Sequence, residues 1–122
     1  MVYVAAECGS PDVKILPDVY HLYKGGSDFN SLKLLKSNYI DIFHMNDYPS
    51  LPDRKSIGDK DRVYPWDGVA PIKDILTNLT SSYKTIVLSI ELFNREYWKQ
   101  DPVEVAKKAL ASMKSSVDLI SK

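Results

Sequence analysis

The sequence contains a single cysteine, no long apolar run and no excess of charge of either sign. Because Cys8 has no second cysteine to pair with, no internal disulfide can form, which fits a reducing compartment. No apolar stretch approaches the roughly 20 residues that span a membrane, and the N-terminus lacks the basic and apolar segments of a signal peptide. We therefore expect a cytoplasmic protein without a membrane partner.

Charge and size narrow the function classes further. The 16 Lys and Arg residues balance the 16 Asp and Glu residues, so the formal net charge is zero. Proteins gain most of their non-specific affinity for nucleic acid by neutralising phosphates, so we expect no nucleic-acid partner, although a local basic patch stays open. With 122 residues, of which 44% are apolar, the chain is long enough for one domain with its own core.

Three apolar runs predict β-strands. They cover residues 13–20, 40–44 and 85–90. Pro17 lies inside the first run and requires an edge, a bulge or an irregular end there. The third run is almost continuously apolar, which is typical of a strand that is covered on both faces.

The helices are predicted from capping residues and from apolar spacing. Ser27 or Asp28 can cap a helix over residues 29–36, and Asp101 and Pro102 begin the final helix. Two further sets of apolar positions recur at helical spacing. They are Ile72, Ile75, Leu76 and Leu79, and then Ala106, Ala109, Leu110, Met113, Val117 and Ile120.

Strand and helix alternate three times, which indicates an α/β fold with a parallel sheet and right-handed crossovers. Three such units are too few to close an eight-stranded barrel, which needs about 250 residues. A three-stranded parallel sheet would leave its edges exposed. We therefore expect an incomplete barrel, either part of a longer protein or completed by association. Residues 47–68 form a long stretch without predicted structure, which suggests a functional loop such as a lid.

Each predicted strand ends on a residue that can bind a metal ion. These residues are Asp18, His44 and Glu91, and the C-terminal ends of parallel strands meet at one edge of a sheet. A lone carboxylate or imidazole at a strand end usually caps a loop or is solvated. Three at equivalent ends favour a shared site for a divalent ion such as Mn²⁺, Co²⁺, Zn²⁺ or Mg²⁺. Asn46 and Asp47, which follow the second strand, are expected to cap the next loop.

Four stretches resemble a known family. DVYH at 18–21, FHMND at 43–47, DRVYP at 61–65 and IELFNREYW at 90–98 are similar to the sugar isomerase/epimerase superfamily with the xylose isomerase-like TIM barrel. That superfamily includes inosose isomerases, hydroxypyruvate isomerases and ketose 3-epimerases, and the likeness is greatest to the isomerases of inositol catabolism. The resemblance implies that residues 1–122 are the last three βα units of the barrel, strands 6 to 8.

The resemblance also implies roles for individual residues. Asp18, His44 and Glu91 would bind the metal, and Glu91 would also transfer the proton. His21 would act beside the metal and bind a substrate hydroxyl or carbonyl, and Arg62 would hold substrate oxygens. The substrate would be a small sugar or sugar derivative.

Two features depart from the family pattern. The family has a first metal ligand, a Glu on the fifth strand, and we expect this chain to begin after that strand. Glu7 lies 11 residues before Asp18, too close for a complete βα unit. The family often has Pro-Gly after its arginine, whereas this chain has Pro65 and then Trp66. Trp66 would cover a bound sugar or pack on the rim of the barrel.

Two alternative functions remain open. The chain could be a non-catalytic fragment or assembly module that forms a homo-oligomer or associates with the rest of the barrel. An apurinic-site endonuclease shares the same superfamily, but the balanced charge and the lack of extra His and Asp ligands argue against it.

Overall fold

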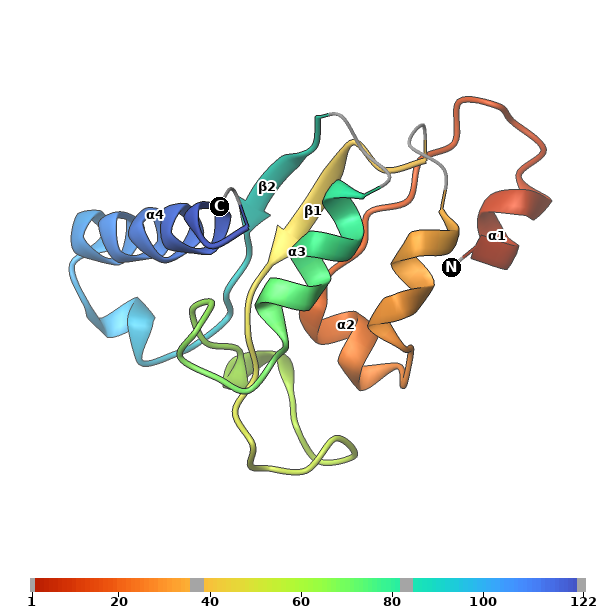
Figure 1. Cartoon of the computed structure of the whole chain (residues 1–122). Coiled ribbons are helices and arrows are strands. Elements are labelled where there is room, and N and C mark those ends of the chain that lie inside the picture. The colour runs from red at the N-terminus through yellow and green to blue at the C-terminus, as the bar shows by residue number, and fades with distance from the viewer. Residues whose placement is uncertain (1, 36–38, 82–84, 121–122) are drawn as a thin grey trace.

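A short parallel sheet runs through the computed structural model, which describes residues 2–35, 39–81 and 85–120. Strand β1 (Ile42–Met45) pairs in parallel with β2 (Val87–Ile90), and His44 lies opposite Ser89. A third, irregular segment lies on the other side of β1, where Asp18 forms a parallel bridge with His44. The parallel arrangement predicted from the sequence is therefore confirmed. Figure 1 shows β1 and β2 side by side.

The first predicted strand is wrong at its C-terminal end. Val19 and Tyr20 belong to helix α2 (Val19–Lys24), and the residues before them form only the bridge to β1. Pro17 has no N–H to donate, although its carbonyl oxygen accepts from His44 N at 2.9 Å. Asp18 then caps the helix, because its Oδ1 accepts from His21 N at 2.9 Å.

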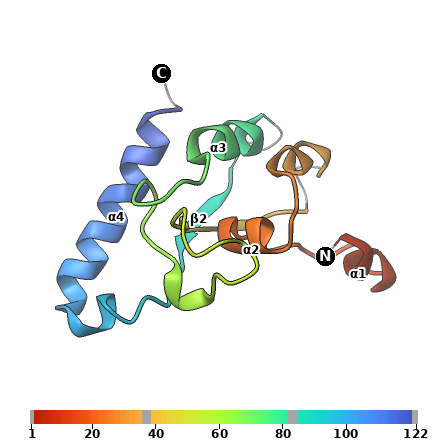
Figure 2. The same cartoon turned by 90° about the horizontal axis from the view of Figure 1, so that it is seen from below.

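The remaining helices follow the predicted order. After a cap at Asp28, η1 (Phe29–Leu34) is a 3-10 helix, and its predicted end at residue 36 lies outside the described residues. Helix α3 (Ile72–Thr80) lies on one side of the sheet. Helix α4 (Pro102–Asp118), which is capped by Asp101, runs past β2 with its C-terminal end near the strand in Figure 1 (Figures 1 and 2). Helix α1 (Val2–Glu7) lies apart from these elements, and no helix in the described ranges is long and apolar enough to span a membrane.

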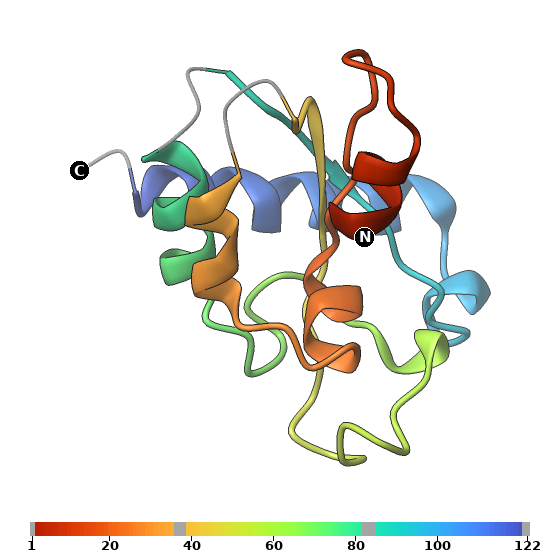
Figure 3. The ribbon, with the colours of Figure 1, turned by 90° about the vertical axis from the view of Figure 1, so that its right-hand side faces the viewer.

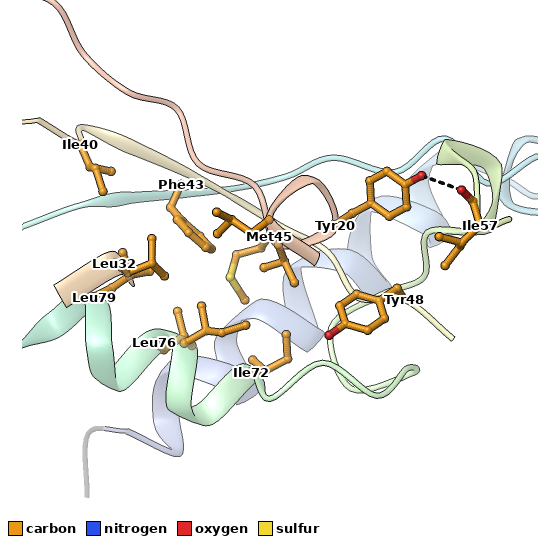
Figure 4. Packing of buried hydrophobic residues seen from close by; sticks show 13 residues of the cluster. Tyr20, Leu32, Ile40, Phe43, Met45, Tyr48, Ile57, Ile72, Leu76 and Leu79 are labelled. Carbon is orange, nitrogen blue, oxygen red and sulfur yellow. Dashed lines mark hydrogen bonds between the residues drawn. The ribbon is translucent and has the colours of Figure 1, made fainter. Parts of the chain in front are cut away.

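The core fills the space between β1 and α3. Phe43 and Met45 are fully buried and point toward Ile72 and Leu76 of α3, as Figure 4 shows. Alternation along the strand sends the intervening side chains to the opposite face. On that face Val87 is 58% exposed, so within the described residues the sheet is covered on one side, not on both as predicted.

Helix α4 buries less of its apolar stripe than the sequence predicts. Ala109 is buried, and Met113 and Ile120 pack against the core. Leu110 is 49% exposed and Val117 is 38% exposed. The stripe is therefore wider than the surface that α3 and β2 offer to it in this chain.

The long loop, residues 47–68, is packed against α2 at the C-terminal ends of the strands (Figures 1 and 3). Ile57 is buried, and its carbonyl oxygen accepts from Tyr20 Oη at 3.2 Å and from Lys24 Nζ at 2.7 Å. The rings of Tyr23 and Tyr48 stack with centroids 3.7 Å apart. The loop contains the 3-10 helix η2 (Asp59–Asp61) and lies beside the strand ends.

Asp47 closes this loop, as the sequence predicts for a capping residue. Its carboxylate accepts from the backbone N–H of Tyr48 at 2.7 Å, Ala70 at 2.8 Å, Trp66 at 3.1 Å and Gly68 at 3.2 Å. Burial raises the pKa of the Asp47 carboxyl, and these backbone donors oppose the rise. The two ends of the loop are thus joined through one side chain.

Gly68 is required by this close approach. A Cβ atom there would overlap the Tyr48 carbonyl oxygen and the Asp47 carboxylate. We expect Gly68→Ala to lower the free energy of unfolding by about 2 kcal/mol, measured by urea denaturation. Gly58→Ala is the matched control, since a Cβ at Gly58 meets only Asp61 Oδ2 at 3.8 Å. Equal stability of the two variants would contradict this account of the loop.

Tyr48 lowers the free energy of unfolding at alkaline pH. Burial, together with Asp47 and Tyr23, raises the pKa of Tyr48 from 10.0 to about 12. The folded protein therefore favours the neutral phenol, and this stabilisation is complete below pH 10 and lost as the pH rises from about 10 through 12. We expect Tyr48→Phe to flatten the fall of unfolding free energy across that range. Urea titrations in this pH range test this, and parallel curves would contradict it.

Candidate metal centre

Asp18, His44 and Glu91 converge at the C-terminal ends of the three parallel segments. Each offers one ligand atom, and these atoms all lie within 4.8 Å of one another. The backbone explains the convergence, because Asp18 bridges to His44 and Glu91 N donates to Met45 O at 3.2 Å. The side chains of Asp18, His44 and Glu91 are 4%, 21% and 35% exposed, so the cluster is buried on one side and open on the other.

Arg62 extends from the long loop into this cluster. Its Nη1 donates to Glu91 Oε2 at 2.7 Å and to Asp18 Oδ2 at 3.3 Å. Its Nη2 lies 2.9 Å from His21 Nε2 and also contacts Asp59. The side chain of Arg62 is only 1% exposed. The structure therefore brings His21 and Arg62, both singled out in the sequence, to the same cluster.

Trp66 lies outside the cluster of Asp18, His44 and Glu91. Its indole Nε1 donates to Ser116 Oγ on α4 at 2.7 Å, and its side chain is partly exposed. In the part of the chain that the structure describes, no hydrogen bond or ion pair joins Trp66 to the cluster. Its φ is +78°, a left-handed conformation that suits glycine and costs another residue about 1 kcal/mol. The substrate contact of Trp66 stays a prediction.

Asn46 was expected to cap the loop that follows it, but its side chain instead contacts Asp18 and the start of α2. Its Nδ2 donates to Asp18 Oδ2 at 2.8 Å, and its Oδ1 accepts from Tyr20 N at 2.9 Å. Asn46 thus orients Asp18 and fixes the start of α2. Residues two positions apart in extended chain face the same side, so its spacing from His44 is a signal that could have identified it.

The residues present fit a divalent cation. Two carboxylates and one imidazole form a mixed oxygen and nitrogen donor set of the kind that binds Zn²⁺ or Mn²⁺. The guanidinium of Arg62 already lies between Asp18 and Glu91, which shows that these carboxylates favour positive charge. Three donors do not complete a coordination shell, so positions stay open for further ligands.

A sequence model of the family described as "Xylose isomerase-like TIM barrel" matches residues 1–116. The chain belongs to this family. It is 33% identical over 117 residues to the inosose isomerase of Bacillus subtilis strain 168, covering 91% of this chain and 38% of that protein. It is 34% identical over 104 residues to the inosose isomerase of Bacillus velezensis, covering 83% of this chain and 36% of that protein. The chain therefore spans less than two fifths of these relatives.

Solved structures agree with this assignment. A crystal structure of the IOLI protein with a bound zinc atom superposes with a TM-score of 0.81 at 28% identity, covering 98% of this chain and 41% of that one. A xylose isomerase domain protein from Alicyclobacillus acidocaldarius gives the same TM-score of 0.81 at 21% identity, covering 99% of this chain and 43% of that one. The second likeness shows the fold alone. The predicted family is thus confirmed, and the parallel segments belong to a TIM-barrel fold.

Proposed function

We propose that this chain is the C-terminal part, strands 6 to 8, of a divalent-metal-dependent isomerase or epimerase that acts on a sugar or sugar derivative. The convergence of Asp18, His44 and Glu91 within 4.8 Å carries the proposal. The likeness to proteins named inosose isomerase supports a cyclic or open-chain polyol ketone as substrate. The zinc atom in the IOLI structure supports the choice of a divalent ion.

In this proposal Asp18, His44 and Glu91 would hold the metal, which would supply Lewis acidity to a substrate carbonyl and its neighbouring hydroxyl and so make the adjacent C–H more acidic. The Glu91 carboxylate removes that proton and returns it to the other face of the same carbon, which is epimerisation. In isomerisation it returns the proton to the neighbouring carbonyl carbon, while the hydroxyl proton passes to the former carbonyl oxygen. Arg62 stabilises the negative charge that develops on the substrate oxygens and keeps Glu91 in place through the 2.7 Å contact.

His21 has a defined hydrogen-bonding state in this arrangement. A guanidinium has only donors, so His21 Nε2 is the acceptor in its 2.9 Å contact with Arg62 Nη2. The ring proton then lies on Nδ1. We infer that Nδ1–H is the donor that His21 offers to a substrate hydroxyl or carbonyl.

The direct test is exchange of the substrate proton with solvent. We expect the full-length protein, incubated in D₂O with a panel of ketoses and inososes, to incorporate deuterium next to the carbonyl. Exchange should stop when a chelator removes the metal and return when Zn²⁺ or Mn²⁺ is added. Absence of metal-dependent exchange across the panel would contradict the proposed function.

A second candidate is a non-catalytic module of the same fold. The exposed sheet face at Val87 favours association with further barrel strands. A folded monomer without metal affinity, detected by sedimentation, would favour this candidate. A metal-containing dimer would argue for the enzyme.

A further inference from the structure

Arg62 contacts two aromatic rings, and its Nη1 and Nη2 atoms are hydrogen-bonded, whereas its buried Nε has no hydrogen-bond partner among the described residues. Its guanidinium carbon lies 4.5 Å from the centroid of the Tyr20 ring and 5.2 Å from that of Phe93. Its carbonyl oxygen accepts from Asn94 Nδ2 at 3.0 Å. The aromatic rings hold the plane of the guanidinium. They do not determine whether Nη1 or Nη2 faces the proposed metal ligands.

The two ends of the guanidinium have different partners. Nη1 contacts the proposed ligands Asp18 and Glu91, whereas Nη2 contacts His21 and Asp59. Of these two partners, Asp59 offers Nη2 a negative charge, because His21 accepts through a neutral ring nitrogen. Both contacts of Nη2 are charge-assisted through the guanidinium, and the contact with Asp59 also pairs opposite charges.

Asp59 is not needed to hold its own turn. The turn is closed by Asp61, whose Oδ2 accepts from Gly58 N at 2.8 Å. The side chain of Asp59 is 57% exposed, so burial does not explain its position either. Among the described residues, the side chain of Asp59 pairs with the guanidinium of Arg62, which is 1% exposed. This contact, unlike an ordinary surface ion pair, acts on a group inside the proposed site.

We propose that Asp59 is a positioning residue that holds the Arg62 guanidinium in one orientation, with Nη1 on Asp18 and Glu91 and Nη2 on His21. Without this contact the guanidinium rotates about its Nε–Cζ bond and shifts toward the two remaining carboxylates. The effect of Asp59 on catalysis rests on the proposed function, whereas its restraint on the Arg62 side chain does not.

The restraint is measured by NMR of the arginine side chain in the full chain. We expect separate ¹⁵N resonances for Nη1 and Nη2 of Arg62, because rotation is slow. Asp59→Asn should accelerate the exchange of these nitrogens at least about tenfold, since it removes a charge-assisted hydrogen bond. Asp59→Glu should restore slow exchange in part. Unchanged exchange in Asp59→Asn would overturn the inference.

Asp61→Asn is the matched control. It removes the same charge from the same short helix, but the Asp61 carboxylate accepts from Gly58 N and forms no hydrogen bond or ion pair with the described Arg62 side chain. We expect its Nη exchange to equal that of the unmodified chain. An acceleration equal to that of Asp59→Asn would assign the effect to charge or loop loosening and would overturn the positioning role.

A double-mutant cycle tests the consequence for the reaction. We expect Asp59→Asn to lower kcat/KM of the full-length protein about tenfold and to have little further effect in an Arg62→Gln background. An equal loss in both backgrounds would show that Asp59 does not act through Arg62 and would overturn the inference. Slow Nη exchange that depends on Asp59, in a protein without isomerase activity, would support the positioning role and contradict the proposed function.

Discussion

Replacing Glu91 with glutamine will lower turnover by about 10²- to 10⁴-fold at saturating metal, because the amide cannot accept the substrate proton. Glutamine keeps an oxygen of the same reach, so the cluster can still assemble around an ion. The loss is therefore expected in kcat more than in metal affinity. Deuterium exchange into the substrate and metal titration by calorimetry, made on the same preparation, separate these two effects.

Glu96→Gln is the control for Glu91. Glu96 lies a few residues further along the chain, and its carboxylate pairs with Lys99 Nζ at 2.7 Å on the surface. We expect its turnover to stay within about twofold of the unmodified protein, since a surface ion pair contributes little. A Glu91→Gln protein that keeps most of its turnover would assign the proton transfer to another group.

Replacing Arg62 with methionine will lower the free energy of unfolding by about 3 kcal/mol in the absence of metal. Arg62 lies 2.7 Å from Glu91 Oε2 and 3.3 Å from Asp18 Oδ2, and its removal leaves the buried Asp18 charge without a cationic partner. A divalent ion neutralises the same carboxylates. We therefore expect Zn²⁺ to stabilise the variant more than it stabilises the unmodified protein, as measured by urea denaturation with and without the ion.

Arg95→Met provides the comparison for Arg62→Met. Arg95 is exposed in the segment between β2 and η3 (Tyr97–Lys99), so its replacement should change stability by less than about 0.5 kcal/mol. If Arg62→Met cost no more than this, the guanidinium would not be balancing the cluster. Equal stabilisation of Arg62→Met and of the unmodified protein by Zn²⁺ would lead to the same conclusion.

The sequence predicted the convergence of the cluster because strand ends are readable from apolar runs. Asp18, His44 and Glu91 each end such a run, and parallel pairing brings the ends together. The boundary of the first run was wrong because an apolar stretch does not distinguish a strand from the first turn of a buried helix. Asp18 caps helix α2 and so marks where the helix begins, but it lies inside the run that was predicted as a strand.

Contacts made by the long loop could not be predicted from local pattern. Arg62 stands at the end of a charged run that resembles a solvated loop, and only the family resemblance singled it out. Its burial depends on the rings of Tyr20 and Phe93, which come from other elements. The pairing with Asp59 likewise depends on how η2 presents its side chains, which composition does not reveal.

Metal content is the measurement that tests the central claim most directly. Elemental analysis of the full-length protein should find near-stoichiometric divalent metal, and His44→Ala should lose it, because that variant removes one of the three converging donors. Metal retained at the same level in His44→Ala, or absent from both proteins after exposure to Zn²⁺ and Mn²⁺, would contradict the claim that Asp18, His44 and Glu91 form a metal site.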